Sequence, residues 1–523
     1  MNELETLKLL IDCKPLTEDD LSHIKREIAK KNKTDLSLNS DLLALYHKFL
    51  KKGKISENKN LALLLRTKKI RSLSGVAVIT IATKPYPCPG NCLYCPSQKN
   101  MPKSYLKDEP AIMRAIRNKF DPYKQTQERI KTLEKNGHPA DKIELIVIGG
   151  TWSYLPYKYQ EWFIKRAFDA CNCKTSKTLS LAQKINEKTK HRMIGLTVET
   201  RPDYIDEKEI LRLRYLGVTR IEMGVQSIYD SVLKINRRGH KIDAVVKATK
   251  LLKDAGFKIC YHMMPNLLGS NLKMDLQMFK EIFSNENFQP DMLKIYPCVV
   301  VPEASLYQWY LKGKYKPYNE KELFKLISKI ILTIPEYCRL QRVIRDIPSN
   351  DIAAGSKTSN LNEIIQRDLL KQGLKSKDIR SREVQDQYLT KEKIYLFKTE
   401  YLASGGKEIF LSYENKDRSK LYSLLRLRIP SNHFNPLEKN ISSLRNAAFI
   451  REVHTYGQLV PLKHQEKAAQ HQGLGKKLML LAEQIAKKEF HIEKMIVISG
   501  IGVRQYYRHL GYHLEKTYMV KRI

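Results

Sequence analysis

Six short runs of apolar and β-branched residues recur along the first two thirds of the chain, and each predicts a buried strand. The segments between them have helical periodicity, and two of them end at Gly137 and Gly256, which suit helix C-caps. Strands that are apolar on both faces and alternate with helices form a parallel sheet. We therefore predict an open, partial (βα)6 TIM-like barrel. The six predicted strands are 75–83, 142–150, 192–200, 220–227, 258–266 and 292–300.

After about residue 400 the pattern changes to shorter strands of antiparallel type, KEIFLSYE, LYSLLRLRIP and AFIREVHTYGQLVPL. They are followed by a helix with an apolar stripe, which opens on the glycine-rich sequence QGLGK (472–476). Backbone N–H groups at such a helix start bind phosphate oxygens. The whole chain is expected to comprise four parts, which are a basic helical segment (1–70), the barrel (71–345), a linker (346–400) and an α+β domain (401–523).

The composition narrows the class of partner. The chain has 523 residues, of which 42% are hydrophobic, so large cores can be buried. Lys and Arg number 93 against 56 Asp and Glu, a net charge of +37. Such an excess favours a polyanion such as nucleic acid. Because the excess is spread along the whole chain, a general compositional bias is the alternative, and the charge identifies no site.

The chain has no sequence signal for membranes or secretion. No apolar run reaches the roughly 18 residues that a membrane span needs. The N-terminus, MNELETLKLLIDCK, lacks the apolar core of a signal peptide. An odd number of cysteines, nine, favours a reducing compartment. We expect a cytoplasmic protein without membrane contact.

Three of the cysteines are packed into one short segment, KPYPCPGNCLYCPSQ. The flanking prolines and glycine predict a loop, in which Cys88, Cys92 and Cys95 can converge on one point. Three thiolates hold a 4Fe–4S cluster and leave one iron free for an external chelating group. Structural zinc normally needs four ligands, so zinc or unligated thiols are the weaker alternative. The C-x3-C-x2-C spacing resembles the radical SAM superfamily, which uses S-adenosylmethionine.

Polar motifs follow four of the predicted strands, at the end where parallel sheets carry their chemistry. In a radical SAM protein the glycine pair lets the backbone approach the methionine amino group, and the other motifs hold the ribose and the carboxylate. Ordinary turns are the alternative for each motif alone. The motifs are Gly149-Gly150-Thr151, Glu199-Thr200-Arg201-Pro202-Asp203, Gln226-Ser227 and His262-Met263-Met264-Pro265.

The C-terminal part resembles GNAT acetyltransferases. Its Q-x-x-G-x-G sequence before a helix is similar to their acyl-CoA pyrophosphate loop, and the following strand KMIVISG and closing RQYYRHLGYHL are in GNAT order. Tyr507, with Tyr506, falls where that fold places a phenol near the thioester sulfur. There it can protonate the leaving thiolate or hold the acetyl group. An aromatic pair in the core is the alternative.

A radical SAM core followed by a GNAT domain resembles the Elongator catalytic subunit family over roughly residues 60–523. The motifs that carry the resemblance are RSLSGVAVITIATKPYPCPGNCLYCP, EPAIMRAIRNKFDPY, REVHTYG, QHQGLG and YYRHLGY. It implies that the chain converts the wobble uridine of tRNA to 5-carboxymethyluridine, with acetyl-CoA and S-adenosylmethionine. A 5′-deoxyadenosyl radical would take hydrogen from the acetyl methyl, and the carbon radical would add at uridine C5. Loss of an electron and a proton, with thioester hydrolysis, would complete the product.

The resemblance also assigns residues. Acetyl-CoA contacts fall on Glu452, Val453, His454, Thr455, Leu474, Gly475, Lys476 and Tyr507. The family's basic residue at the start of the second barrel strand matches Lys142, for which a solvated strand start is the alternative. The segment 1–70 would bind the tRNA, with Tyr46 and Phe49 as stacking platforms or core residues. Homodimerisation or Elongator-like partner subunits would be compatible with this family.

The sequence departs from the family pattern at two places. The linker positions that match a family cysteine pair for zinc are Ser376 and Ser381, so we predict no zinc. Asn266 and Leu268 replace the usual Gly and Pro in a loop expected near the S-adenosylmethionine pocket. Two other functions are alternatives, a protein lysine acetyltransferase with a structural iron–sulfur cluster and a tRNA-binding scaffold whose chemistry has decayed. The intact cysteine triad argues against the scaffold.

Overall fold

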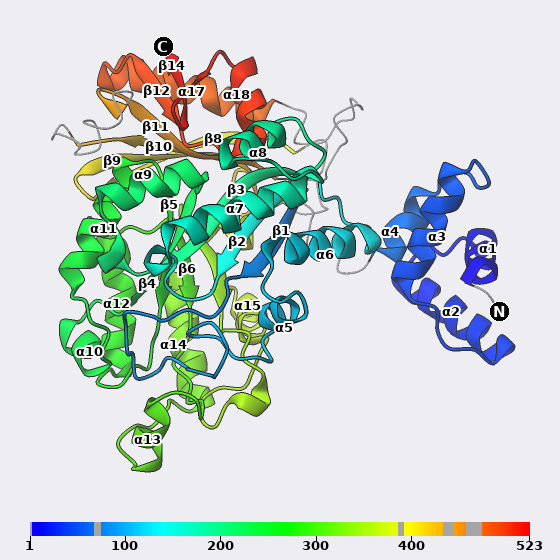
Figure 1. Cartoon of the computed structure of the whole chain (residues 1–523), viewed down its shortest axis with the longest axis horizontal. Helices are drawn as coiled ribbons and strands as arrows, with labels where there is room; N and C mark the ends of the chain where they lie inside the picture. The colour runs from blue at the N-terminus through cyan, green and yellow to red at the C-terminus, as the bar shows by residue number, and fades with distance from the viewer. Residues whose placement is uncertain (1–2, 67–74, 385–391, 432–443, 457–472) are drawn as a thin grey trace.

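The computed structural model describes residues 3–66, 75–384, 392–431, 444–456 and 473–523. A helical segment lies at one side of the molecule, a strand–helix barrel fills its centre, and a second sheet covers one end of that barrel (Figure 1). None of the helices within these ranges is long and apolar enough to cross a membrane.

The barrel is a curled sheet of seven parallel strands in sequential order. The expected fold class, a partial parallel barrel followed by a second domain of mixed sheet, is confirmed. Six strands coincide with the predicted runs, whereas β7 was not predicted because Arg339, Gln341 and Arg342 interrupt its apolar pattern. The strands are β1 (Val76–Ala82), β2 (Lys142–Ile148), β3 (Arg192–Thr200), β4 (Arg220–Gln226), β5 (Lys258–Met263), β6 (Met292–Ile295) and β7 (Arg339–Val343).

Amphipathic helices cover the outer face of this sheet, whereas α13 projects away from it (Figure 1). Side-chain caps define where several of them begin: Asp121, Asp206 and Asn319 each accept a hydrogen bond from the first turn. The helices are α5 (Pro110–Arg117), α6 (Pro122–Lys135), α7 (Tyr157–Asn172), α8 (Leu179–Asn186), α9 (Glu207–Leu216), α10 (Asp230–Ile235), α11 (Ile242–Asp254), α12 (Leu272–Ser284), α13 (Leu306–Leu311), α14 (Glu320–Thr333), α15 (Leu361–Lys371) and α16 (Ile379–Arg382).

The inner face of the barrel is polar. Successive side chains of a strand point to opposite faces, so the residues that alternate with the apolar core of each strand face the lumen. On β4 and β5 these positions carry Arg220, Glu222, Lys258 and His262, and on β6 they carry Lys294. A closed barrel fills its interior with apolar side chains, whereas this open one lines its interior with charges.

Within the described residues the second sheet also has seven strands, in the order β13-β14-β12-β11-β10-β9-β8, and among these only β11 and β12 pair in parallel. It begins at Tyr395, within the range that was expected to be linker, and that range also holds α15 and α16. The strands and helices are β8 (Tyr395–Ala403), β9 (Gly406–Glu414), β10 (Leu421–Ile429), β11 (Ala448–Thr455), α17 (Leu474–Phe490), β12 (Lys494–Val497), α18 (Arg504–His509), β13 (His513–Glu515) and β14 (Tyr518–Arg522).

The N-terminal segment folds as four helices with a core of its own. Tyr46 belongs to that core, is 1% exposed, and its hydroxyl accepts a hydrogen bond from the Asn58 amide. Of its two alternatives, Tyr46 therefore takes the core role. Lys135 of α6 pairs with Asp41 and ties the segment to the barrel. The helices are α1 (Glu3–Cys13), α2 (Glu18–Asn32), α3 (Asn39–Lys51) and α4 (Lys59–Leu65).

Buried ion pairs join the second sheet to the barrel. The Arg451 guanidinium of β11 bonds both oxygens of Asp291, which precedes β6, and also reaches Glu408 of β9 at 3.0 Å. Lys253 of α11 lies 3.8 Å from Asp291 and 3.6 Å from Glu408. All four side chains are at most 1% exposed. Burial would raise the pKa of the Asp291 carboxyl, but Arg451, Lys253 and Arg426 hold that pKa well below its usual range.

We expect Arg451→Met to destabilise the protein by about 3–5 kcal/mol, because it leaves two buried carboxylates short of a cation. Removing the surface pair of Lys398 with Glu489 by Lys398→Met should cost less than about 1 kcal/mol. Since the folded-state pKa of Asp291 is lowered, its stabilising effect is complete above about pH 4 and is lost as the pH falls through that pKa. Chemical unfolding followed by circular dichroism measures both variants, and equal stability of Arg451→Met and wild type would contradict the expectation.

Candidate active site

The three cysteines lie in the loop between β1 and α5, at the C-terminal end of the barrel strands. The loop is tied down by backbone bonds, in which Leu93 N–H donates to Asn236 O at 3.1 Å and Cys95 N–H donates to Cys92 O at 3.2 Å. Cys88, Cys92 and Cys95 all line one cavity of about 650 Å³. The cavity size is that of a ligand site rather than a packing defect.

The surroundings of the thiols suit an anionic metal cluster. Arg238 Nη1 donates to Cys92 Sγ at 3.6 Å, and Cys88 Sγ lies 3.6 Å from Thr151 Oγ1. Burial, reinforced by the neighbouring Cys92, raises the pKa of the Cys95 thiol to about 11. A bound metal overcomes such a shift because a coordinating thiol is deprotonated outright. Three convergent thiols and a buried guanidinium therefore fit a 4Fe–4S cluster with one open iron.

The glycine pair after β2 meets a strict backbone requirement. Gly149 has φ +134° and Gly150 has φ +97°, conformations that L side chains rarely adopt. A Cβ on Gly149 would lie 2.1 Å from Thr83 Oγ1. The pair thus lets the chain turn closely over β1 and brings Thr151 beside Cys88.

The polar strand ends line the same cavity. Glu199, Thr200, Arg201, Gln226 and His262 are among its walls. Arg201 Nε donates to Asp203 at 2.9 Å, and its Nη2 donates to the other Asp203 oxygen at 2.7 Å. The predicted motif residues that are not part of the lining are Gly149, Pro202, Asp203, Ser227, Met263 and Pro265.

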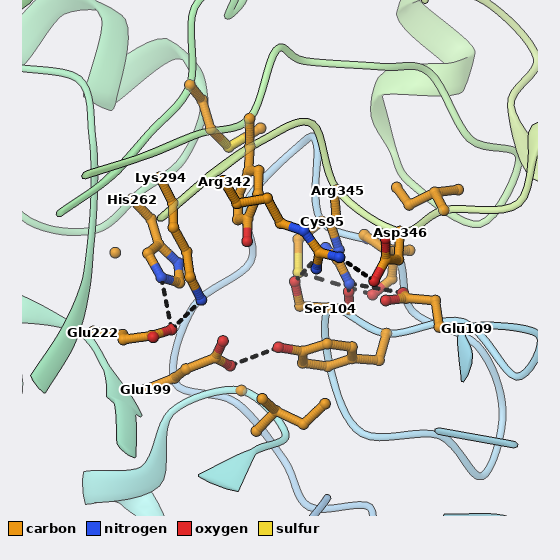
Figure 2. Close-up of a pocket in the computed structure, with 18 of the residues that line it drawn as sticks. Cys95, Ser104, Glu109, Glu199, Glu222, His262, Lys294, Arg342, Arg345 and Asp346 are labelled. Carbon is orange, nitrogen blue, oxygen red and sulfur yellow. Dashed lines mark hydrogen bonds and ion pairs between the residues drawn. The ribbon is translucent and has the colours of Figure 1, made fainter. Parts of the chain in front are cut away.

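Several lining residues were not predicted from the sequence. They include the basic side chains of Lys294, Arg342 and Arg345 (Figure 2). The phenol of Tyr105 also lines the cavity and donates to Glu199 Oε2 at 2.6 Å. Lys294 occupies an inner position of β6. An isolated lysine between apolar strand residues could have indicated a side chain that faces a polar site. Arg342 and Arg345 sit in and after β7, the strand that the apolar pattern did not predict.

The predicted acetyl-CoA residues divide between the two faces of β11. A Cβ on Gly475, in the first turn of α17, would lie 3.4 Å from both Thr455 Oγ1 and Tyr506 Oη, and 3.9 Å from Val453. Val453, Thr455, Gly475 and Tyr506 are therefore brought together. Gln472 lies outside the described residues, while Lys476 is exposed and Leu474 is buried against Val384 and Tyr422.

The alternate β11 residues face the barrel. Glu452 accepts from Arg426 at 2.8 Å and from Lys258 of β5 at 3.2 Å. The His454 ring lies against the Tyr456 ring, with ring centres 4.3 Å apart and an interplanar angle of 38°, and burial lowers the pKa of its imidazole to about 4. Tyr456 in turn accepts a hydrogen bond from Arg339 of β7 at 3.2 Å. This face of β11 thus meets the N-terminal ends of the barrel strands.

The two C-terminal tyrosines differ in environment. Tyr506 is 40% exposed and borders Gly475, whereas Tyr507 is 6% exposed and packs in the core beside Tyr512. Burial raises the pKa of both phenols. Lys142 is half-buried at the start of β2, on the barrel end that faces the second sheet, and burial lowers the pKa of its ammonium.

The linker serines form a hydrogen-bonded cluster. Ser376 Oγ donates to Asp378 Oδ1 at 2.9 Å, Ser381 Oγ donates to the same oxygen at 2.5 Å, and Leu340 N–H donates to Asp378 Oδ2 at 3.1 Å. Asp378 thereby anchors α16 to β7. Serine hydroxyls are poor zinc ligands, and here both are engaged by the carboxylate.

The second departure lies under the cysteine loop. Asn266 adopts φ 68°, which asparagine tolerates, and its backbone N–H donates to Asp275 Oδ2 at 2.6 Å. Leu268 packs in a cluster with Leu93 and Val232. Neither residue lines the cavity, and Leu268 belongs to the same apolar cluster as Leu93 of the cysteine loop.

Comparison with known proteins defines the class. The family model of the radical SAM superfamily matches residues 86–282, and that of the Radical_SAM C-terminal domain matches residues 290–371. The three cysteines, the glycine pair and most of the residues that line the cavity lie within these ranges. This chain is a radical SAM protein.

Full-length relatives define the family. The chain is 47% identical over 488 residues to the tRNA uridine(34) acetyltransferase of Methanocaldococcus infernus, which covers 91% of this chain and 90% of that protein. It is 40% identical over 473 residues to the Elongator complex protein 3 of Homo sapiens, covering 87% and 86%. The solved structure of M. infernus Elp3 without residues 1–46 matches with a TM-score of 0.75 and 44% identity, covering 86% of this chain and all of that one. The chain belongs to the Elongator complex protein 3 family.

We expect Cys92→Ala to abolish the iron–sulfur absorbance of protein reconstituted anaerobically with iron and sulfide, because two thiols cannot hold the cluster. Cys173→Ala, at an exposed cysteine outside the cavity, is the matched control and should retain full iron content. Iron analysis and visible absorbance measure the effect. Equal iron in the two variants would contradict this assignment.

We expect purified protein to contain iron but no stoichiometric zinc, because Ser376 and Ser381 bond Asp378. Asp378→Ala should instead destabilise the protein by about 1–3 kcal/mol, since it strands the buried Leu340 amide and removes the helix cap. Elemental analysis and thermal unfolding test the two statements. One zinc per chain would contradict the first.

Proposed function

We propose that this chain forms 5-carboxymethyluridine at the wobble position of tRNA, using acetyl-CoA and S-adenosylmethionine. The carrying observation is that Cys88, Cys92 and Cys95 line a cavity at one end of the barrel, while β11 of the second sheet contacts the other end through Glu452 and Lys258. The names of the relatives supply the substrate class, tRNA uridine 34. The reaction joins the acetyl methyl carbon to uridine C5 and releases CoA by thioester hydrolysis.

The cysteine loop and the strand ends would hold the radical-forming groups. Cys88, Cys92 and Cys95 would hold a 4Fe–4S cluster, which when bound would supply the electron for reductive cleavage of S-adenosylmethionine. The turn at Gly149 and Gly150 offers a backbone close to the cysteines, and Arg201 Nη1 is buried without a hydrogen-bond partner in the described chain. Arg201 is therefore suited to the methionine carboxylate.

The second domain would bind acetyl-CoA at its GNAT-type loop. The amide groups that open α17 suit the pyrophosphate, and Val453 and Thr455 border the same place. Tyr506 Oη lies at the loop, so we assign it the phenol role near the thioester, with Tyr507 supporting it from the core. Glu452 and His454 would shape the passage between the two sites, and Lys142 would meet CoA at the barrel end.

Basic surfaces would hold the tRNA. Lys and Arg side chains neutralise phosphates and release counterions, so binding should weaken steeply with salt. The helices α2 and α3 carry such residues toward their C-terminal ends, including Lys30, Lys31, Lys48 and Lys51. Arg114 and Lys103 line the cavity and suit the backbone of a splayed nucleotide.

One anaerobic assay tests this proposal. Reconstituted protein, a reductant, S-adenosylmethionine, acetyl-CoA and tRNA should yield 5′-deoxyadenosine and carboxymethyluridine, detected by mass spectrometry. Cys92→Ala should reduce both products at least about 100-fold, whereas Cys173→Ala should not. Tyr506→Phe should lower carboxymethyluridine formation about 10-fold or more and leave cluster content unchanged.

The main alternative is a protein lysine acetyltransferase with a structural cluster. It predicts acetylation of amines by Cys92→Ala at the wild-type rate, and that outcome would refute the radical mechanism. A salt-independent tRNA affinity would remove the argument from charge.

A further inference from the structure

One wall of the cavity carries polar groups that neither the cysteine loop nor the acetyl-CoA loop uses. Figure 2 shows Lys294, His262 and Glu222 grouped together, with Glu199 beside them. They come from the neighbouring strands β3 to β6, and all four line the cavity. Rigid strands hold their side chains in fixed relative positions, which is what recognition of a small planar ligand requires.

Lys294 is a fixed hydrogen-bond donor. Its Nζ donates to Glu222 Oε2, which also accepts from His262 Nε2 at 3.1 Å. Burial would lower the pKa of the Lys294 ammonium, but Glu222, and to a lesser extent Tyr296 and Glu199, hold it above its usual range. The ammonium has three protons, and Glu222 takes only one of them. Lys294 therefore has donors left for a ligand in the cavity.

Glu199 is a matching acceptor. Its Oε2 accepts the hydroxyl proton of Tyr105 at 2.6 Å, while Oε1 makes no hydrogen bond within the described part of the chain. Tyr105 is itself held in place, since the Arg345 guanidinium lies 4.7 Å from its ring centre and donates to Glu109 at 2.8 Å. Glu199 and Lys294 are close enough for the carboxylate to act on the ammonium electrostatically.

We propose that Lys294 and Glu199 read the substrate base, with Lys294 donating to uracil O4 and Glu199 accepting from uracil N3–H. This proposal rests on the proposed function, because that function makes a uridine the substrate. The edge of uracil presents an acceptor at O4 and a donor at N3, which is the complement of an ammonium beside a carboxylate.

Cytosine is rejected by the same pair at both positions. Its N4 amino group would face the ammonium, and its N3 lone pair would face the carboxylate. A site built to hydrogen-bond one edge discriminates strongly against an analogue that leaves its buried polar groups unpaired. Because O4 is attached to C4, the neighbour of C5, holding O4 also fixes the position of the reacting carbon.

Binding of two short RNAs tests the proposed base recognition, called the reading below, independently of turnover. The probes are anticodon stem-loops that carry either uridine or cytidine at the wobble position, titrated against the reconstituted full-length protein by fluorescence anisotropy. We expect wild type to prefer uridine about 10-fold or more, and Lys294→Met to bring that ratio to within about 2-fold of unity. Lys294→Arg keeps a charged donor and should retain at least half of the preference on a logarithmic scale.

Three further variants sharpen the result. Lys177→Met removes an exposed lysine outside the cavity and should leave the ratio unchanged, which accounts for the loss of one charge. Glu199→Gln should lower the preference at least about 3-fold. The double variant Lys294→Gln with Glu199→Gln can accept from N4 and donate to N3, so it should favour cytidine.

The outcomes separate this proposal from the function on which it rests. If Lys294→Met and Glu199→Gln fold normally by circular dichroism and keep the wild-type ratio, the reading is overturned. If they change the affinity for S-adenosylmethionine and not the ratio, the pair serves that ligand and the reading is again overturned. If wild type discriminates between the RNAs but forms no carboxymethyluridine, the reading stands and the proposed reaction fails. Should Lys294→Met not fold, Lys294→Arg and Glu199→Gln decide the matter.

Discussion

The buried ion pairs of Asp291 and Glu408 with Arg451 fix how the second sheet is placed against the barrel. Charges that leave water must each meet a partner in good geometry, so a network of this kind allows few relative placements of the surfaces that carry it. An apolar interface would tolerate sliding much better. The network presents β11 to the N-terminal ends of the barrel strands, where Glu452 meets Lys258 and Tyr456 meets Arg339.

Because of this placement, the two ends of the barrel have different neighbours. The cysteine loop lies at the C-terminal end of the strands, and β11 of the second sheet adjoins the opposite end. Between them the lumen carries Arg220, which pairs with Glu144 at 2.6 Å and lies 3.7 Å from Glu222. Charged side chains thus line the lumen between the cysteine end of the barrel and the end that meets β11. A tightly packed apolar barrel would separate them, whereas the open sheet leaves space for substrates and keeps its inner face polar.

The sequence was informative wherever a local pattern has one physical meaning. Six strands followed from apolar runs, and the cysteine spacing with its prolines predicted the cluster loop and its class of cofactor. The pattern failed at β7, because its lumen-facing residues are polar and conceal the periodicity. The family resemblance assigned four consecutive residues of β11 to acetyl-CoA, and this assignment stays a prediction. The structure adds that Glu452 faces the barrel, whereas Val453 and Thr455 lie beside Gly475.

The amino-acid sequence alone therefore predicted six of the seven barrel strands and the family, and it indicated which cysteines would hold a cluster, because these inferences depend on residues close together in the chain. Only the tertiary structure decided which distant residues meet. Lys294 and Glu222 come from different strands, as do Asp291 and Arg451 from different domains, and no local spacing brings them together. Their significance arises from burial, which turns an ordinary charged residue into one that must have a partner, and burial is a property of the folded chain.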